Sequence, residues 1–142
     1  MFSTPVRELM EPRKLLLAAP ETTVREAARS MARRTVGAVL VVQDDRLLGI
    51  FTERDVVFRV VARGLDPTKL TISEVMTADP KTITGDKSFG HAMLLMHENG
   101  FRHLPVVENG RPIGIVSSRS ALDPDLEEFV SEERRRKHFE QH

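Results

Sequence analysis

The stretch GIFTERD at residues 49–55 recurs as GIVSSRS at residues 114–120. Both copies open with glycine, isoleucine and a further apolar residue, place a hydroxyl in the fourth position and keep an arginine in the sixth. They differ in the last position, where Asp55 corresponds to Ser120. The recurrence predicts one local structure used twice, and the difference predicts two sites of unequal chemistry.

The two copies lie within a longer internal repeat. At an offset of 65 residues, which brings Gly49 onto Gly114, VVQDDRLLGIFTERD aligns with VVENGRPIGIVSSRS without a gap. The match continues upstream, where Ala27 meets Ala92 and, after a one-residue slip, the LM of RELMEP meets the VM of SEVMTADP. A repeat of this length is one supersecondary unit, and two such units are expected to bury their apolar faces against each other.

Each half is predicted to contain a helix, two strands and a second helix, preceded by a short strand. Apolar residues at helical spacing behind a threonine or serine cap indicate the first helix, and two apolar runs indicate the strands. The dipeptide Asn109-Gly110 between two such runs predicts a type I′ hairpin. A further helix is predicted after each hairpin, beginning at Thr52 or Ser117. The predicted first helices span 23–34 and 88–99, and the predicted strands span 38–42, 47–51, 103–107 and 112–116.

The composition indicates a globular protein and excludes several kinds of chemistry. Of the 142 residues, 40% are hydrophobic and 30% charged, which is typical of a folded domain. Lysine and arginine together number 21, as do aspartate and glutamate, so the basic surplus of a nucleic-acid-binding protein is missing. The absence of cysteine excludes disulfides, thiolate catalysis and cysteine-ligated zinc. The early apolar run at 15–19 is too short for a signal peptide or a membrane span, so we expect a cytoplasmic protein without a membrane partner.

Thr52 and Asp55 have a purely structural interpretation. Thr-x-x-Asp at a strand-to-helix junction forms a capping box, in which the threonine side chain accepts from a backbone N–H and the aspartate accepts from the threonine N–H. Such a cap contributes about 1 kcal/mol to helix stability and requires no ligand.

The same geometry also suits a ribonucleotide. The N–H groups and partial positive charge at a helix N-terminus attract phosphate, to which the Thr52 hydroxyl could donate. The Asp55 carboxylate can accept two hydrogen bonds at once from the cis-diol of a ribose. Gly49 would let a ligand or a neighbouring strand come close to the backbone. The motif alone leaves both interpretations open.

Together with the repeat, these motifs resemble a tandem pair of cystathionine-β-synthase-type (CBS) domains over about residues 6–123. The resemblance rests on GIFTERD and GIVSSRS, on the preceding GAVLVV and RHLPVV, and on MTADPKTIT before the second unit. It implies an α+β fold of two βαββα units, related by pseudo-twofold symmetry and packed through their sheets, with a helical C-terminal tail outside them. The expected units span 1–66 and 67–123, and the tail spans 124–142.

The resemblance implies a regulatory module rather than an enzyme. Many members bind AMP, ADP or ATP, and some bind S-adenosylmethionine, in clefts between the units. We therefore expect an adenosine nucleotide as a regulatory ligand, with no catalytic cofactor and no metal site. The resemblance places Thr52 at phosphate and Asp55 on the ribose. It implies that the strand before each hairpin lines a cleft, which indicates Gly37 and Ala38 in one copy and Arg102 and His103 in the other. It also implies that the entry strand packs on the adenine, which indicates Lys81, Thr82 and Ile83, without fixing how these segments combine across the two clefts.

The second copy of the motif is expected to bind a nucleotide poorly. Ser117 keeps the cap and the phosphate contact, but Ser120 removes the carboxylate. A serine hydroxyl does not replace bidentate acceptance by a charged group, because charge-assisted hydrogen bonds are roughly twice as strong as neutral ones. We expect one competent cleft, which contains Asp55, and one weakened or empty cleft, which contains Ser117 and Ser120.

The resemblance also implies a homodimer that forms through helices. The candidate face is the helix at 56–64, where four valines cluster on one side, although the same valines would also suit a core. A change at this face could reach an unidentified effector protein. The alternative function is a scaffold or interaction module with no bound nucleotide, for which the Thr-x-x-Asp motif is only a helix cap.

Overall fold

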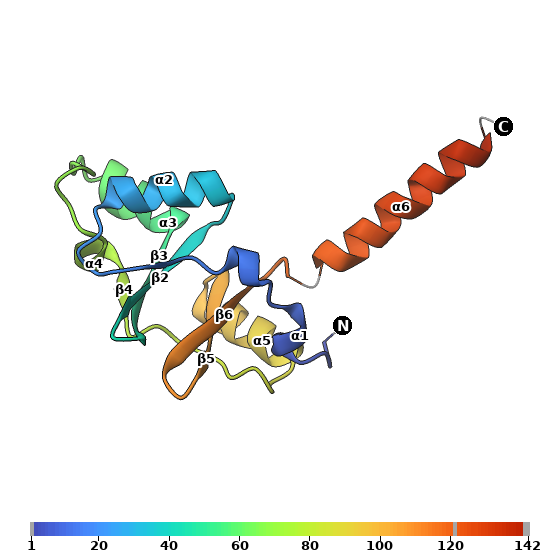
Figure 1. Ribbon diagram of the computed structural model, residues 1–142, viewed down its shortest axis with the longest axis horizontal. Coiled ribbons are helices and arrows are strands. Elements are labelled where there is room, and N and C mark those ends of the chain that lie inside the picture. The colour runs from blue at the N-terminus through green and yellow to red at the C-terminus, as the bar shows by residue number, and fades with distance from the viewer. Residues whose placement is uncertain (1, 121, 141–142) are drawn as a thin grey trace.

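The structure is a computed structural model that describes residues 2–120 and 122–140. Two units lie side by side, and a long helix extends away from them (Figure 1). The first unit contains β1 (Leu17–Ala18), α2 (Val24–Arg34), β2 (Ala38–Gln43), β3 (Arg46–Thr52), α3 (Glu53–Asp55) and η2 (Val56–Val61). The second contains α5 (Phe89–Asn99), β5 (His103–Glu108) and β6 (Arg111–Ser117). The remaining elements are α1 (Val6–Leu9), η1 (Pro12–Lys14), α4 (Ile72–Val75), β4 (Thr77–Ala78) and α6 (Leu122–Glu140).

Both predicted first helices and all four predicted hairpin strands are confirmed. Of the two threonines that the sequence offers as a cap for α2, Thr22 and Thr23, the structure uses Thr23, whose Oγ1 accepts a hydrogen bond from the Glu26 N–H at 3.1 Å. The β5–β6 hairpin turns at Asn109 and Gly110, whose φ angles of 54° and 78° are those of the predicted type I′ turn.

The predicted helix start at Ser117 is wrong. Residues 118–120 form a turn, in which the Ser120 N–H donates to the Ser117 carbonyl at 3.1 Å, and α6 begins only at Leu122. In the first copy, by contrast, α3 continues directly from Thr52 into the wider turns of η2. Residues 53–55 of the first copy are therefore helical, whereas residues 118–120 of the second copy are not.

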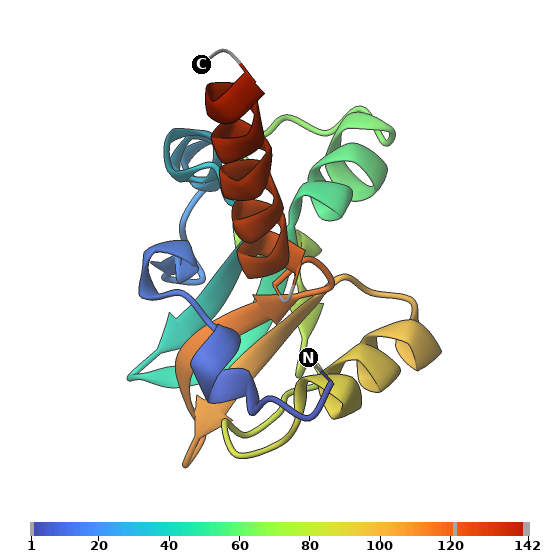
Figure 2. The ribbon, with the colours of Figure 1, turned by 90° about the vertical axis from the view of Figure 1, so that its right-hand side faces the viewer.

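The tail predicted at 124–142 lies, as far as it is described, within α6, which already begins at Leu122. This helix projects away from both units (Figure 1, Figure 2). Phe129 and Val130 are exposed along it, so these two side chains do not dock on the rest of the chain.

The strands form two sheets, one in the order β1-β2-β3-β4 and one made of β5 and β6. In the antiparallel pair β2–β3, Ala38 lies opposite Thr52, and in β5–β6, His103 lies opposite Ser117. The start of each hairpin is therefore adjacent to the hydroxyl residue of the same unit's motif.

The short helices α1 and α4 are exchanged between the units. Val6 of α1 packs into the hydrophobic cluster of the second unit, and Ile72 and Val75 of α4 pack into that of the first. Strand β4 extends the first sheet, where Thr77 pairs with Ile50. The hydrophobic core of each unit thus includes a short helix that belongs to the other sequence repeat, so the boundaries of the cores differ from those of the repeats.

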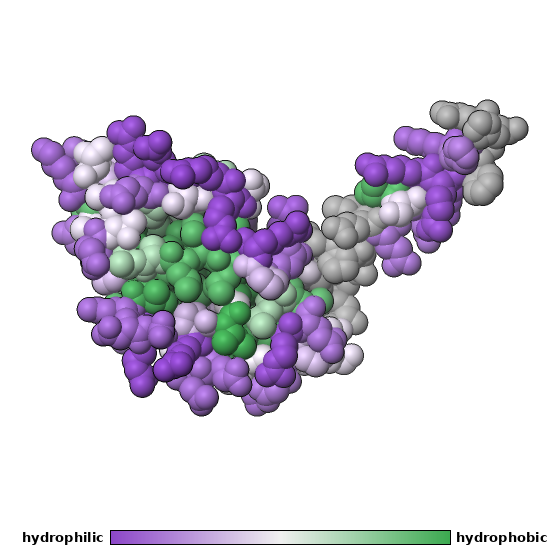
Figure 3. Space-filling view, viewed as in Figure 1, coloured by the Kyte–Doolittle hydropathy of each residue, from purple (hydrophilic) through white to green (hydrophobic). Residues whose placement is uncertain are grey.

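A third, smaller cluster joins the two units through their sheets, as predicted. Leu40 and Ile50 of the first sheet pack with Ile115 of the second, and Leu15 lies against them. Figure 3 shows apolar residues gathered between the units on one face, framed by hydrophilic side chains.

The repeated glycine of the motif is explained by the exchange of α1 and α4. A Cβ atom on Gly49 would collide with Met76 Sδ and lie 2.8 Å from the Thr77 carbonyl oxygen. A Cβ atom on Gly114 would collide with Met10 Sδ. These two methionines are the ones that the repeat aligns after its one-residue slip, and each covers the glycine of the other repeat.

We expect Gly49→Ala and Gly114→Ala each to destabilise the protein by about 1–3 kcal/mol, because the added methyl group overfills a packed contact. The atoms nearest to a Cβ on Gly114 all belong to the Met10 side chain, whereas a backbone carbonyl also crowds Gly49. Met10→Ala should therefore restore more of the stability lost in Gly114→Ala than Met76→Ala restores of the stability lost in Gly49→Ala. Urea unfolding of the single and double variants measures both coupling energies. Equal coupling at the two sites would contradict this explanation.

Candidate functional site

Two clefts open between the units. One, with a volume of about 880 Å³, is lined by Asp55 and is called the Asp55 cleft. The other, of about 740 Å³, is lined by Ser120 and is called the Ser120 cleft. Glu53, Arg102 and His103 line both, so the clefts share a wall. Both volumes are in the range of small-molecule sites.

Each cleft combines the motif of one unit with segments of the other. The Asp55 cleft takes Thr52 and Asp55 from the first unit and Lys81 from the segment before the second. The Ser120 cleft takes residues 117–120 from the second unit and residues 37–38 from the first. Neither cleft can exist in one unit alone.

Asp55 is buried and closes the predicted capping box. Its Oδ2 accepts from the Thr52 N–H at 2.8 Å and from Thr52 Oγ1 at 3.3 Å, and its own N–H donates to Thr52 Oγ1 at 3.4 Å. Its Oδ1 pairs with Arg59 Nε at 3.4 Å. Arg59 in turn donates to the carbonyls of Val75 and Met76 at 3.0 and 3.1 Å. The structural interpretation of this motif is confirmed, and the carboxylate also lines the cleft.

Ser120 occupies the equivalent place in the second copy. The Ser117 N–H donates to Ser120 Oγ at 2.8 Å, the distance found between the Thr52 N–H and Asp55. The substitution therefore removes a negative charge while keeping the local hydrogen bond. The side-chain hydrogen bond to the cap residue thus keeps its length, while the group that accepts it changes from a carboxylate to a hydroxyl.

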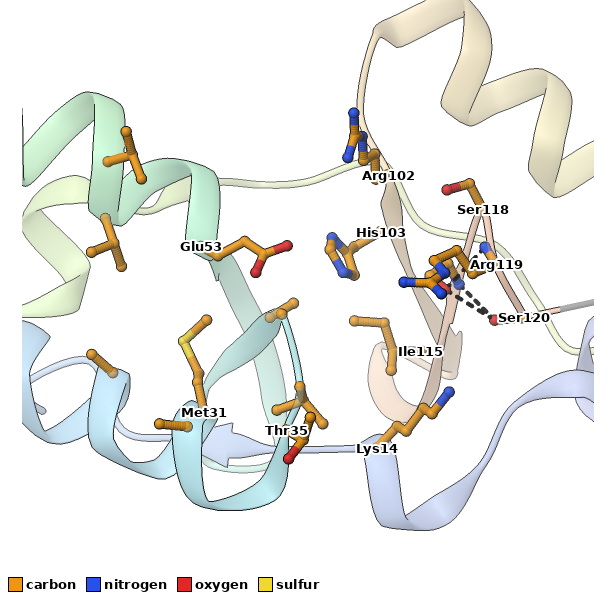
Figure 4. Close-up of a pocket in the computed structure, with 18 residues that line it drawn as sticks. Lys14, Met31, Thr35, Glu53, Arg102, His103, Ile115, Ser118, Arg119 and Ser120 are labelled. Carbon is orange, nitrogen blue, oxygen red and sulfur yellow. Dashed lines mark hydrogen bonds between the residues drawn. The ribbon is translucent and has the colours of Figure 1, made fainter. Parts of the chain in front are cut away.

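The shared wall places an imidazole beside a carboxylate. Figure 4 shows Glu53, after β3, and His103, at the start of β5, facing each other across the gap between the units. Gly37 lies close to both, since a Cβ on it would be 3.1 Å from Glu53 Oε1 and 3.1 Å from His103 Nε2. Burial lowers the pKa of His103 below its usual value, while Glu53 acts in the opposite direction and Arg102 adds to the decrease.

The structure distributes the predicted site residues over both clefts. Lys81 joins Thr52 and Asp55 in the Asp55 cleft, and residues 37–38 lie in the Ser120 cleft. Arg102 and His103 line both clefts, although successive side chains of a regular strand alternate between its two faces. Residues 82–83 line neither cleft, and Ile83 is buried in the core of the second unit.

Several cleft residues were not identified from the sequence. Glu53 stands inside the quoted motif, where its replacement by Ser118 was visible as a second difference between the copies. Arg59 lies four residues after Asp55, the spacing at which helical ion pairs form. Lys14 precedes β1 as Lys81 precedes the second unit, so the repeat itself could have indicated it.

The described residues contain neither a candidate metal site nor a helix suited to span a membrane. No group of three or more histidine, aspartate or glutamate side chains among residues 2–120 and 128–138 is arranged to hold a metal ion. No helix among these residues combines the length and apolar character needed to cross a membrane.

Comparisons with known proteins agree with this arrangement. A family model described as "CBS domain" matches residues 6–62 and again residues 72–125. The CBS domain-containing protein CBSCBSPB2 of Arabidopsis thaliana is 43% identical over 110 residues, which make up 77% of this chain and 20% of that protein. The match thus spans about a fifth of the length of this plant relative.

Solved structures share the fold. An uncharacterised conserved protein from Pyrococcus horikoshii superposes with a TM-score of 0.81 at 28% identity, over 88% of this chain and 94% of its own. A CBS domain protein from Pyrobaculum aerophilum, described as complexed with AMP, superposes with a TM-score of 0.75 at 27% identity, over 82% of this chain and 88% of its own.

The lowered pKa of His103 predicts a pH-dependent stability. In the unfolded chain the imidazole takes up a proton as the pH falls through about 6.5, whereas the folded protein resists protonation until a lower pH. Its contribution to stability is therefore fully present above pH ~6.5 and is lost as the pH falls toward the folded-state pKa. We expect the free energy of unfolding of the wild type to decrease relative to that of His103→Gln between about pH 7 and pH 5. Parallel pH curves from urea unfolding would show that His103 titrates normally.

Proposed function

The chain belongs to the CBS domain family, and from that premise we propose that it is a regulatory module that binds an adenosine nucleotide in the Asp55 cleft. Binding of AMP, ADP or ATP alters a dimer or partner surface, and the module carries out no catalysis of its own. On this proposal it acts in the cytoplasm.

The observation that carries the proposal is the set of groups gathered around the Asp55 cleft. Asp55 accepts hydrogen bonds from the ribose, and Thr52 donates to the phosphate. Lys81 and Arg102, from the other unit, add positive charge for the phosphate. Phe58 contributes an aromatic surface to the same cleft, which suits the adenine ring. The AMP complex of the Pyrobaculum aerophilum protein, which has the same fold, supports this choice of ligand.

The cleft adjoins an exposed apolar surface. Arg54 lines the cleft and stacks over the Phe58 ring, with its Cζ 4.7 Å from the ring centroid. Phe58 is 59% exposed, and Val57 and Val61 beside it are 54% and 68% exposed. A phosphate that attracts Arg54 would therefore disturb a side chain of this surface, which links ligand binding to a partner interface.

The alternative is a scaffold or interaction module with no bound nucleotide. It is favoured by the hydrogen bonds of Asp55, because one oxygen accepts from Thr52 and the other pairs with Arg59. A ribose must use the remaining lone pairs of this carboxylate or displace Arg59.

Exchanging the two last residues of the motif distinguishes the proposals. We expect Asp55→Ser to weaken adenosine-nucleotide binding about tenfold or more, because a charge-assisted acceptor is lost. The variant should still fold, since Ser120 already caps the equivalent turn. Ser120→Asp should create a second nucleotide site, which isothermal titration calorimetry would register as a stoichiometry of two per chain.

Ser120→Ala is the matched control for this exchange, because it changes the same residue without adding a carboxylate. It should leave the stoichiometry at one. The scaffold would be favoured if none of the three nucleotides bound to the wild type. It would also be favoured if the heat of nucleotide binding were the same in the wild type, Asp55→Ser and Ser120→Asp.

The dimer is proposed to form through the apolar surface of Val57, Phe58 and Val61. The predicted cluster of four valines divides here, because Val60 is buried whereas Val57 and Val61 are exposed. Val61→Lys should convert a wild-type dimer into a monomer in light scattering, since a charge placed in an apolar interface is costly to bury. Val130→Lys, on α6, is the control and should remain dimeric. A wild type that is monomeric at all concentrations would end this part of the proposal.

A further inference from the structure

The Ser120 cleft has two sides of opposite character. The side that the first unit provides is largely apolar and includes Met31 and Val36, with Ile115 nearby. The side that η1 and the second unit provide carries Lys14, Arg102 and Arg119. Figure 4 shows Met31 across the cavity from Arg119, whose side chain is directed toward the cavity.

Two of these cations have no partner in the described part of the chain. Among the side chains of residues 2–120 and 128–138, the guanidinium groups of Arg102 and Arg119 have no hydrogen-bond or ion-pair partner. In the Asp55 cleft, by contrast, Arg54 stacks on an aromatic ring and Arg59 pairs with Asp55. The Ser120 cleft thus offers guanidinium groups that a ligand can engage without breaking an existing contact.

Among the described residues that line the cleft, little negative charge lies beside Arg102 and Arg119. Glu53 is the one carboxylate among the described residues that line the Ser120 cleft, and it lies at the shared wall beside His103. Asp55 and Asp79 add two further carboxylates to the other cleft. The local charge at the Ser120 cleft therefore favours an anion, and its planar guanidinium groups suit the paired oxygens of a phosphate.

The contacts to such an anion must come from side chains. The backbone N–H groups of the turn are already used: Ser118 donates to the Arg102 carbonyl at 3.1 Å, Arg119 to Ser117 Oγ at 3.3 Å and Ser120 to the Ser117 carbonyl at 3.1 Å. The Ser118 hydroxyl, which lines the cleft, has no hydrogen-bond partner among the described residues. It can donate to an oxygen of the anion beside the arginines.

We propose that the Ser120 cleft binds an organic phosphate that has an apolar ring and needs no ribose. The phosphate faces Arg102, Arg119 and the Ser118 hydroxyl, and the ring packs against Met31 and Val36. The loss of the carboxylate at position 120 then changes the class of ligand rather than merely disabling a nucleotide site. Arg102 also lines the Asp55 cleft, whereas Arg119 and Ser118 line only the Ser120 cleft, so this site is tested through Arg119 rather than through Arg102.

The test uses 1-naphthyl phosphate, which carries both features and no ribose. In isothermal titration calorimetry we expect one site in the wild type, binding weakened about tenfold or more in Arg119→Ala, and unchanged binding in Asp55→Ala. Arg25→Ala is the matched control, because this exposed arginine of α2 lines neither cleft and its removal changes the net charge equally. Inorganic phosphate and 1-naphthol, which each carry one of the two features, should bind at least about tenfold more weakly than 1-naphthyl phosphate.

Three results would overturn the proposal. The first is no binding of 1-naphthyl phosphate at millimolar concentration. The second is a loss in Asp55→Ala with binding retained in Arg119→Ala, which would place the ligand in the other cleft. The third is an equal decrease in affinity for 1-naphthyl phosphate in Arg119→Ala and Arg25→Ala, which would show that only the net charge of the protein matters. Failure of the nucleotide proposal would be separate, because it would appear as adenosine-nucleotide binding that does not respond to Asp55→Ser.

Discussion

The close approach of a methionine to a glycine, made once in each unit, is the contact on which the arrangement of the molecule depends. Met76 lies against Gly49 and Met10 lies against Gly114. Helix α4, from the second repeat, therefore packs on the first unit, and α1, from the first repeat, packs on the second unit. A side chain at Gly114 would displace the Met10 side chain, and one at Gly49 would also crowd the Thr77 backbone. Because each core contains a helix from the other repeat, the two units cannot separate without exposing apolar surface in both.

This exchange also creates the clefts. Chain segments that come after the crossing helices carry Lys14 and Lys81 into the space between the units, where each lysine meets the motif of the opposite unit. The pseudo-twofold relation gives two such spaces, and Glu53 and His103 form the wall between them. A ligand that moves this wall on one side changes the lining of the other. The two clefts are therefore physically adjacent compartments rather than independent pockets.

Asp55 illustrates how one residue can serve stability and recognition together. Its carboxylate completes the capping box with Thr52 and holds Arg59, which in turn binds the carbonyls at the end of α4. The same carboxylate lines the cleft. A ligand that binds Asp55 therefore affects both the start of α3 and, through Arg59, the end of α4. Ser120 retains the hydrogen bond to its cap residue but has no charge with which to hold a cation, and the neighbouring Arg119 side chain has no partner among the described residues. The difference of one residue thus alters both the ligand chemistry and the electrostatic balance of a cleft.

The sequence by itself determined the repeat, the hairpins and the caps, because these depend on residues close together in the chain. Apolar runs, the Asn109-Gly110 turn and the Thr52–Asp55 box each carry their own local signal, and each is found in the structure. The tertiary structure alone decided which residues share a cleft. Residues 37–38 were predicted to line a nucleotide cleft, without the pattern fixing which motif they join, and they lie with Ser120, because each cleft joins the motif of one unit to the strand start of the other. The burial of Ile83 was likewise settled by packing, since a core position is not fixed by its neighbours in sequence.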